Sequence, residues 1–450
     1  MVKVSLLESR GKILKVVKFG GSSVASGECF ENVKKIVDAD PARAMVVVSA
    51  PGKRFSGDMK VTDLLYLLRA HIKYNAPYDE LFAKIEARYE EICAYFNMEN
   101  ILKDDFAEFK KNLSKKTSTD YIVSRGEYWC AKIMAKYLGF AFVDSAEWLV
   151  FNYAGKVMLE ESYSNLRKIA ESIQKMVIPG FYGAMLDGNI KTFSRGGSDI
   201  TGSIVAAALS ATAYENWTDV SGILAADPRI VDNPRPIDKV TFAELRELSY
   251  MGAEVLHEDA VFPVRNKSIP LYIKNTKDIN APGTLIMESF DEDRNEQSKI
   301  RPITGVSGKK NYTIITVTKG RMEEEPGCIQ KVLEIFTAFE INVEQVPCSI
   351  DTFSVIVAHD AVSDKLHSII TRIEQAIDPD SIKITNEISL IAVVGRNLER
   401  NIGIAGRIFT ALGENDINIR FIGQGADEVN IIIGVDDANF KKAIRVLHDF

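Results

Sequence analysis

The sequence predicts an α/β protein in which a mainly parallel sheet with a helical insertion is followed by two ferredoxin-like βαββαβ repeats. Three observations lead to this fold class. Short apolar runs alternate with helical patterns through the first half of the chain, which is typical of a parallel sheet. The stretch from Thr62 to Met134 is almost wholly helical in pattern. The C-terminal third contains two similar copies of one pattern.

The composition is that of an ordinary globular protein and excludes several functional classes. The 450 residues, 46% of them hydrophobic and 26% charged, favour two or more domains. The net charge of −7 argues against nucleic acid as a partner. No apolar run reaches the roughly 18 residues of a membrane span, and the start lacks a signal-peptide core, so no membrane partner is expected. The five scattered cysteines predict no disulfide framework, no protein-held metal and a cytoplasmic location.

The first elements are a strand, a glycine turn and a helix. The apolar run Lys12–Lys18 predicts the strand, Gly20-Gly21-Ser22-Ser23 predicts the turn, and a helical pattern through Phe30 follows. A second strand, Ala44–Val48, ends at a turn. The helical insertion forms a cap on the sheet, and further strands are expected near Phe140–Val143, Met176–Gly180 and Lys191–Phe193.

A domain boundary is expected in the charged stretch Glu288–Lys299, which has little to bury. Beyond it lie the two copies, because at one constant offset Gly403 overlies Gly327 and Ile417-Asn418-Ile419 overlies Ile341-Asn342-Val343. The expected domains are therefore residues 1–299, 300–387 and 388–450.

The second repeat lacks a strand of its own. It ends at Phe450 directly after its closing helix, and a βαββα unit would leave a bare sheet edge. The nearest unassigned strand-like segment is Ile303–Ser307, just before the first repeat. We expect this segment to complete the second repeat, so that the first repeat is threaded between the two parts of the second.

Two glycine pairs are candidate phosphate or substrate sites. At Lys18–Ser23 the glycines let the backbone approach a phosphate and the lysine adds positive charge, although a plain tight turn would look the same. At Ser194–Asp199 a second pair precedes an apolar helix, where Arg195 could clamp a carboxylate and Asp199 could orient Lys18. The alternative is a capped helix start with a solvent-exposed arginine.

Three further segments carry polar groups that could have either a functional or a structural role. Asn216–Ile223 and then Asp227-Pro228-Arg229 would suit nucleotide recognition at a sheet edge, or an Asx-type turn. In Ser124-Arg125-Gly126-Glu127 the pattern by itself favours a solvent-exposed Glu127 on an amphipathic helix. His257 in its apolar segment is expected to be structural.

Taken in order, these segments resemble the aspartate kinase family, enzymes of amino-acid-kinase fold that phosphorylate the side-chain carboxylate of aspartate with ATP. The resemblance covers essentially the whole chain: K-F-G-G-S-S, S-R-G-E, S-R-G-G-S-D, W-T-D-V-x-G-I, D-P-R, G-A-E-V-L-H and two repeats similar to ACT regulatory domains. Each fragment is modestly specific, whereas the ordered set is highly specific. The resemblance implies an amino-acid-kinase catalytic domain followed by two ACT repeats.

The resemblance also implies residue roles. Lys18 and Asp199 would be the catalytic pair. The implied ATP-binding residues are Lys18, Phe19, Gly20, Gly21, Ser22, Thr218, Asp219, Leu224 and Arg229. The implied aspartate-binding residues are Thr62, Glu127, Phe181, Arg195 and Ser198, with Glu127 on the α-ammonium and Arg195 on the α-carboxylate. The chain departs from the family pattern at two positions. Several members carry a nucleotide-binding lysine where this chain has Glu254, so Glu254 is not assigned to ATP. Some members carry tyrosine where this chain has Leu224.

The expected reaction is in-line transfer of the γ-phosphoryl group to an ionised carboxylate, which needs no general base. Catalysis then depends on positioning and on charge neutralisation by Lys18, the glycine-turn N–H groups and a Mg²⁺ ion that arrives with ATP. Alternatives are an enzyme of the same fold acting on glutamate, acetylglutamate or carbamate, and an inactive amino-acid sensor. Glu127 and the tandem repeats count against the first, and the joint presence of Lys18, Arg195, Asp199 and Asp219 against the second.

An amino-acid effector is expected at the first repeat, and in the resembling enzymes this region binds the inhibitor. The residues concerned are Met322, Gly327, Cys328, Ile329, Asn342, Val343, Glu344 and Ser349, on a helix start and a strand. Lysine is the first choice, because Glu344 and the run Glu323-Glu324-Glu325 offer negative charge for its second ammonium; threonine is the alternative. These glutamates could instead form a solvated rim. A homodimer through the repeats is expected, with a tetramer as the larger alternative.

Overall fold

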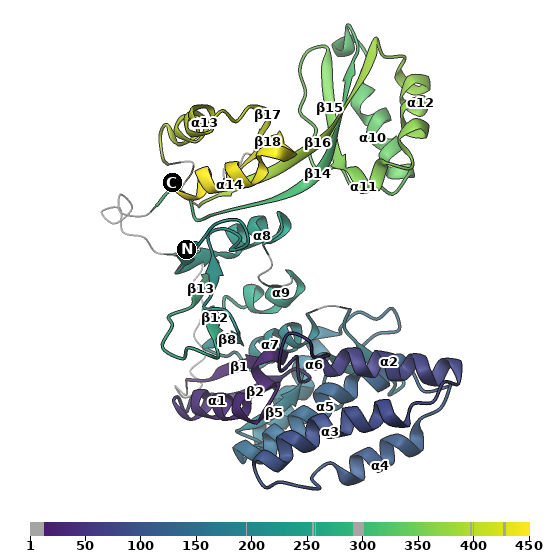
Figure 1. Ribbon diagram of the computed structural model, residues 1–450, viewed down its shortest axis with the longest axis vertical. Helices are drawn as coiled ribbons and strands as arrows, with labels where there is room; N and C mark the ends of the chain where they lie inside the picture. Colours follow the sequence, from purple (N-terminus) through teal and green to yellow (C-terminus); the bar gives the residue numbers. More distant parts are fainter. Residues whose placement is uncertain are drawn as a thin grey trace. The chain divides into compact units, whose positions relative to one another are not determined.

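The computed structural model describes residues 13–194, 196–253, 256, 258–290, 301–396, 398, 400–425 and 429–450. These residues form two compact units, and Figure 1 shows the course of the chain through both. The first unit comprises Met1–Ile223, Pro236–Phe242 and Val255–Phe290, and the second comprises Leu224–Arg235, Ala243–Glu254 and Asp291–Phe450. Of the described helices, none combines the length and the apolar character that crossing a bilayer requires.

Eight strands form the main sheet of the first unit, in the order β11-β13-β12-β8-β1-β2-β5-β3. All neighbouring pairs are parallel except β12 with β13, which confirms the mainly parallel sheet that the sequence predicts. The strands are β1 (Lys15–Phe19), β2 (Arg43–Val48), β3 (Ala141–Phe142), β5 (Met176–Pro179), β8 (Ala213–Thr218), β11 (Lys239–Thr241), β12 (Leu271–Asn275) and β13 (Thr284–Met287).

Smaller elements surround this sheet. The segment predicted near Lys191–Phe193 is a strand, β7 (Ile190–Thr192), but it pairs with β6 (Tyr182–Met185) and not with the main sheet. The third strand of that small sheet is β4 (Val150–Phe151), and β9 (Ile223–Leu224) pairs with β10 (Pro236–Ile237). The accompanying helices are α1 (Gly27–Asp38), α6 (Leu159–Ser172), α7 (Gly197–Ala208) and α9 (Glu258–Asn266), with the 3₁₀ turns η1 (Gly21–Val24) and η2 (Ser145–Glu147).

The helical insertion is present as predicted and consists of four helices. They are α2 (Val61–Tyr74), α3 (Asp79–Tyr95), α4 (Lys103–Asn112) and α5 (Thr119–Leu138), visible together in Figure 1. Aromatic side chains form much of the core between them: the ring of Trp129 lies 4.9 Å from that of Phe106 and 5.1 Å from that of Phe109. Such pairs of rings stabilise a core beyond the area they bury. The insertion is therefore a packed layer that buries α5.

The second unit contains a five-stranded antiparallel sheet in the order β15-β14-β16-β18-β17. Its strands are β14 (Gly305–Thr318), β15 (Thr352–Ala358), β16 (Ser381–Val394), β17 (Ile419–Gln424) and β18 (Asn430–Asp436). Its helices are α8 (Phe242–Tyr250), α10 (Cys328–Ala338), α11 (His359–Val362), α12 (Leu366–Ile377), α13 (Ile404–Glu414) and α14 (Phe440–His448), with the 3₁₀ turns η4 (Met322–Glu324) and η5 (Asp437–Asn439). Two apolar cores lie against this sheet, one for each repeat.

The strands β14 and β16 each run through both repeats. Residues 305–309 pair with residues 390–394 beside the second repeat, and residues 314–318 pair with residues 381–385 beside the first. The segment that the sequence assigns to the missing strand thus lies next to β16, on the side opposite β18. Between the two halves the register shifts, and Asn311 and Glu387 adopt the left-handed φ values of 68° and 58°.

One expected strand is absent from the described residues of the first repeat. The segment Asn342–Ser349 makes only isolated bridges, Gln345 with Ile356 and Cys348 with Phe353. Pro347 has no backbone N–H and cannot donate to a continuous ladder, which explains the interruption. The corresponding segment of the second repeat has no proline and forms the regular strand β17.

Candidate functional site

The candidate site lies where several parallel strands of the first unit end together. Phe19 at the end of β1 is in register with Val48 of β2 and Trp217 of β8, and Val48 is in register with Pro179 of β5. The segments that follow these strands therefore meet at one edge of the sheet. Crevices at the carboxyl ends of parallel strands are where open α/β sheets bind ligands.

The glycine turn after β1 is held by backbone hydrogen bonds from two sides. The N–H of Gly20 donates to the carbonyl of Trp217 (3.1 Å), and the N–H of Gly52 donates to the carbonyl of Gly21 (2.8 Å). A Cβ atom on Gly21 would lie 2.9 Å from the carbonyl oxygen of Ala50, so this position has no room for a side chain. The η1 turn that follows has no side-chain cap, so the start of the turn keeps backbone N–H donors for a ligand.

A buried charged cluster lies behind this turn. The Nζ atom of Lys18, a residue that is 7% exposed, is 2.5 Å from Oδ1 of Asp199 in the first turn of α7. Asn216 of β8 contacts both: its Nδ2 donates to Oδ1 of Asp199 (2.9 Å), and its Oδ1 accepts from Nζ of Lys18 (3.4 Å). The structure thus brings Lys18 and Asp199 together, and adds an asparagine for which the sequence suggests no individual role.

The start of α7 packs tightly against the segment after β5. A Cβ atom on Gly180 would lie 2.5 Å from Oγ of Ser198. Phe181 has a left-handed φ of 78°, which is rare for a bulky residue, and its N–H donates to Oγ1 of Thr201 (3.1 Å). The structure therefore places Phe181 beside the helix start that carries Ser198. Arg195, just before this helix, lies outside the described residues.

Glu127 is buried, contrary to the expectation from its local pattern. It lies in the middle of α5 and is 5% exposed, because the insertion helices cover this side of the sheet. Its Oε1 accepts from the N–H of Ala50 (3.0 Å), whereas its Oε2 is buried and has no hydrogen-bond partner among the residues that the structure describes. Burial raises the pKa of Glu127 to about 8. An unpaired buried carboxylate oxygen is costly, and a ligand ammonium would supply the missing partner.

Thr62 and a residue that sequence reasoning missed flank the same loop. Thr62 lies in the first turn of α2, where the N–H of Val61 donates to the carbonyl of Pro51 (3.1 Å). Arg88 of α3 is 4% exposed and donates from NH2 to the carbonyl of Gly52 (2.7 Å) and from NH1 to Asp58 (2.8 Å). The Arg88 side chain therefore anchors the loop that approaches the glycine turn; no sequence motif marks it.

The residues implied to bind the rest of the nucleotide form two pairs, one in each unit. Thr218 ends β8, and its Oγ1 donates to Oδ1 of the exposed Asp219 (3.2 Å). Leu224 and Arg229 belong to the second unit, where NH2 of Arg229 is 2.9 Å from Oδ2 of Asp227. Hydrogen bonding to Arg229 lowers the pKa of Asp227. Glu254 and His257 lie outside the described residues.

The predicted effector residues cluster beside the core of the first repeat. Cys328 belongs to that core, and Met322, Ile329 and Val343 pack against it. Gly327 precedes α10 with a left-handed φ of 85° and no side-chain cap. Three of the predicted effector residues have polar side chains that contain oxygen. Two of them, Asn342 and Ser349, are exposed, and the third is Glu344.

Glu344 is bonded to α8. Its Oε2 accepts a hydrogen bond from the hydroxyl of Tyr250 (2.6 Å), the last residue of that helix. Burial, together with this bond, raises the pKa of Tyr250. The same helix holds the second repeat through Glu247, which accepts from Nδ2 of Asn430 (2.5 Å). Because α8 starts directly after β11, the chain passes from the main sheet into a helix that is bonded to both repeats.

The glutamate run near the effector segment is partly neutralised. Lys319 forms an ion pair with Glu325 (3.0 Å), and Arg321 lies 4.0 Å from Glu324. These exposed pairs are weak individually. They nevertheless reduce the negative charge on which the choice of lysine as effector depends.

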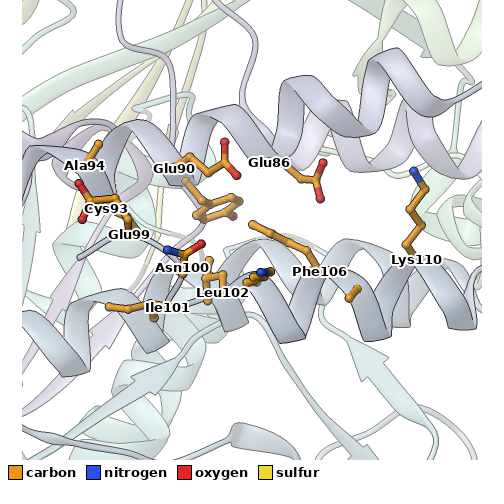
Figure 2. Close-up of a pocket in the computed structure, with 13 residues that line it drawn as sticks. Glu86, Glu90, Cys93, Ala94, Glu99, Asn100, Ile101, Leu102, Phe106 and Lys110 are labelled. Carbon is orange, nitrogen blue, oxygen red and sulfur yellow. The ribbon is translucent and has the colours of Figure 1, made fainter. Parts of the chain in front are cut away.

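A pocket of about 480 Å³ lies elsewhere, between α3 and α4 of the insertion. Figure 2 shows Glu86, Glu90 and Lys110 around it, with Phe106 on the α4 side. None of its lining residues belongs to the predicted sites. Tyr89 lines the pocket from α3 and donates its hydroxyl to the carbonyl of Gly126 (2.7 Å).

The residues that the structure describes contain no group of three or more His, Cys, Asp and Glu side chains suited to a metal ion. The donors at the edge of the sheet are instead backbone N–H groups and the Lys18 ammonium, which suit an anion. This donor set fits a polyphosphate whose own oxygens carry the Mg²⁺ ion.

Comparison with known proteins agrees with this architecture. Residues 14–275 match the amino acid kinase family, and residues 391–449 match an ACT domain. The chain is 36% identical to Aspartokinase 3 of Bacillus subtilis, over 97% of this chain and 98% of that protein. It is 44% identical to a crystal structure of Clostridium acetobutylicum aspartate kinase, described as an allosteric enzyme, with a TM-score of 0.91 over 97% of this chain and 99% of that one. It is 25% identical to E. coli aspartokinase III in complex with lysine and aspartate, with a TM-score of 0.68 over 97% and 99% of the two chains.

Proposed function

The chain belongs to the aspartokinase family of ATP-dependent phosphotransferases, and from this premise we propose that it transfers the γ-phosphoryl group of ATP to the side-chain carboxylate of L-aspartate, giving 4-phospho-L-aspartate. The observation that carries this proposal is the buried pairing of Lys18 with Asp199 behind an uncapped glycine turn. A preorganised ammonium next to free backbone donors is what a transferring phosphoryl group requires.

The nucleotide is assigned to the edge of the sheet. Lys18, with Phe19, Gly20, Gly21 and Ser22, binds the phosphates. Thr218 and Asp219 of the first unit, and Leu224 and Arg229 of the second, are assigned to the rest of the nucleotide. Mg²⁺ carried by the phosphates would neutralise part of their charge. The exposed Asp219 supports this assignment because it offers a polar group, and the glycine turn supports it because no side chain caps its first N–H groups.

Aspartate is assigned to Thr62, Glu127, Phe181, Arg195 and Ser198. The unpartnered Oε2 of Glu127 supports a role in binding the α-ammonium. The guanidinium of Arg195 is suited to the α-carboxylate, which it can bind through two parallel hydrogen bonds. The reactive side-chain carboxylate is then left to face the nucleotide.

The chemistry follows from charge and position. The aspartate carboxylate is ionised at neutral pH and attacks phosphorus without a general base. Lys18 reduces the repulsion between two anions and stabilises the charge on the transferred group, and Asp199 holds the Lys18 side chain in place. The backbone N–H groups of the glycine turn orient the phosphates, so the reacting oxygen and phosphorus meet in line.

Regulation is assigned to the C-terminal region. We divide the chain into a catalytic domain, residues 1–299, and two ACT repeats, residues 300–387 and 388–450, and assign an amino-acid effector to the first repeat. The carboxylate of Glu344 and the uncapped start of α10 suit the ammonium and the carboxylate of a free amino acid. Lysine remains the first choice and threonine the second. The repeats are also assigned as the surface through which two copies of the chain dimerise.

The decisive experiment is ATP turnover with a panel of amino-acid acceptors. Aspartate should be phosphorylated, whereas glutamate, acetylglutamate and carbamate should not. Lys18→Ala should lower kcat by about 10²–10³. Lys15→Ala is the matched control, since Lys15 lies on the same strand and is paired with Asp40 (2.8 Å), and this variant should keep its turnover. Turnover of Lys18→Ala close to that of the wild type would refute the assignment.

A further inference from the structure

Asn216 lies next to Lys18 on one face of the main sheet. The two residues are directly in register across the parallel pair β1 and β8, so their side chains leave the sheet on the same side. Asn216 is 3% exposed and is flanked on its other side by Ile273 of β12. A buried amide needs hydrogen-bond partners, and among the described residues the Asn216 side chain has them only in the Lys18 and Asp199 side chains.

The two contacts determine which way the amide of Asn216 points. Its Oδ1 accepts from the ammonium of Lys18 (3.4 Å), and its Nδ2 donates to Oδ1 of Asp199 (2.9 Å). The amide of an asparagine offers an acceptor and a donor on two separate atoms, one for each partner. A leucine of similar size would offer neither, and an aspartate would set a second carboxylate against Asp199.

The three side chains therefore form a closed triangle. Lys18 is 2.5 Å from Asp199, and Asn216 forms a hydrogen bond with each of them. A lysine side chain has four rotatable bonds and loses much rotamer freedom when it is fixed. A single ion pair would leave the ammonium able to swing about Asp199, whereas a second anchor on β8 restricts that motion.

We infer that Asn216 is a positioning residue for phosphoryl transfer, which keeps the Lys18 ammonium and the Asp199 carboxylate where the transferred group needs them. This inference rests on the proposed function. It concerns kcat and not substrate affinity, because Asn216 bonds to Lys18 and Asp199 and, within the described part of the chain, to none of the residues assigned to aspartate.

The test compares three variants of the full-length protein. Asn216→Leu should lower kcat by about 10- to 100-fold, with both KM values within about threefold of wild type. Asn216→Asp should lower kcat at least as much. The double variant Asn216→Asp with Asp199→Asn exchanges the carboxylate and the amide, and should recover several-fold of the kcat lost in Asn216→Asp, because one acceptor for Lys18 and one donor between the two side chains are restored.

A control separates positioning from loss of stability. Ser162 is fully buried in the same unit, and its Oγ accepts from the N–H of Val150 (3.0 Å) and donates to the carbonyl of Met158 (2.8 Å), so Ser162→Ala also removes buried hydrogen bonds. It should lower the melting temperature without lowering kcat. If wild type phosphorylates aspartate but Asn216→Leu keeps its kcat, or if the exchange variant recovers nothing, the role of Asn216 is refuted while the proposed function stands. Absence of aspartate phosphorylation in wild type would refute the proposed function itself.

Discussion

Glu127 in the first unit and Glu344 in the second are each assigned to the ammonium group of an amino acid, yet their surroundings differ. Glu127 is 5% exposed, and one of its carboxylate oxygens has no hydrogen-bond partner in the described part of the chain. Glu344 is half-buried, and its carboxylate already accepts a hydrogen bond from Tyr250. A buried, unsatisfied carboxylate favours any cation that reaches it. The carboxylate of Glu344 keeps further lone pairs for a cation, but the hydroxyl of Tyr250 competes for its negative charge, so a cation should bind it less strongly than it binds a carboxylate with no donor.

The second repeat sharpens this contrast. The constant offset between the repeats places Arg420 at the position of Glu344. Its Nε and NH2 atoms are 2.8 and 2.9 Å from the two carboxylate oxygens of Asp436. An ammonium group would therefore meet a carboxylate at position 344. At position 420 it would meet a guanidinium that is already in a bidentate ion pair. The two repeats therefore share their order of helices but differ in the charge of the side chain at this position.

The largest effect is expected at the buried carboxylate. Glu127→Gln removes the charge that would face the α-ammonium, so the KM for aspartate should rise by about 100-fold, as when one partner of a buried ion pair is removed. The KM for ATP should change by less than about threefold. Steady-state kinetics with each substrate varied in turn measure this, and Glu86→Gln on α3 is the control. Equal increases in both KM values would indicate a structural role for Glu127.

A pH profile tests the same carboxylate without mutation. Because burial raises the pKa of Glu127 to about 8, the free protein holds this group protonated below that pH. An ammonium stabilises the ionised form, so aspartate binding must release a proton. The KM for aspartate should therefore fall as the pH rises from about 6 to about 8, by at most about tenfold per unit, and then level off. In Glu127→Gln this slope should vanish; a slope that persists there belongs to another group.

A smaller effect is expected at the first repeat. Glu344→Gln should raise the concentration of lysine that gives half-inhibition by about tenfold, since a hydrogen bond to a charged group is lost. Arg420→Gln, at the equivalent position of the second repeat, should leave inhibition unchanged. Inhibition titrations of the two variants decide the matter, and an equal effect of both would mean that the site is not confined to the first repeat.

The smallest expected effect is a strengthening of inhibition. Tyr250→Phe removes the hydroxyl that occupies Glu344, so half-inhibition should need about threefold less lysine. Tyr312→Phe serves as the control, because Glu344 influences the pKa of Tyr312 only through its charge. Titration of both variants measures the difference. Weaker inhibition in Tyr250→Phe would show that the tyrosine stays bonded to Glu344 when the effector is present.

Much of the fold was open to prediction because it is encoded locally. The apolar runs of β1, β2 and β5, the four insertion helices and the glycine turn are each marked by neighbouring residues. The pairing of Lys18 with Asp199 was also predictable, since both follow from motifs at the ends of adjacent elements. The pattern of neighbouring residues predicts an element well where the residues of one short segment determine its structure.

Other features depend on residues far apart in the chain and could not be predicted. The pattern around Glu127 favours an exposed position, and only the packing of α2 and α3 against α5 buries it. The bond from Tyr250 to Glu344 joins segments separated by the whole start of the first repeat. The missing strand at Asn342–Ser349 is a different case, since Pro347 is a local signal that predicts an interrupted ladder.

The sharing of β14 between the repeats constrains how the protein is made. Residues 305–309 leave the ribosome early, but their partners, residues 390–394, follow only after the entire first repeat. At roughly 5–20 residues per second, this interval lasts several seconds. During it, the later half of β14 can already pair with β15, while the earlier half keeps an unpaired edge. Until residues 390–394 have been made, the edge of this segment that later faces β16 has no strand to pair with, and an unpaired edge favours aggregation.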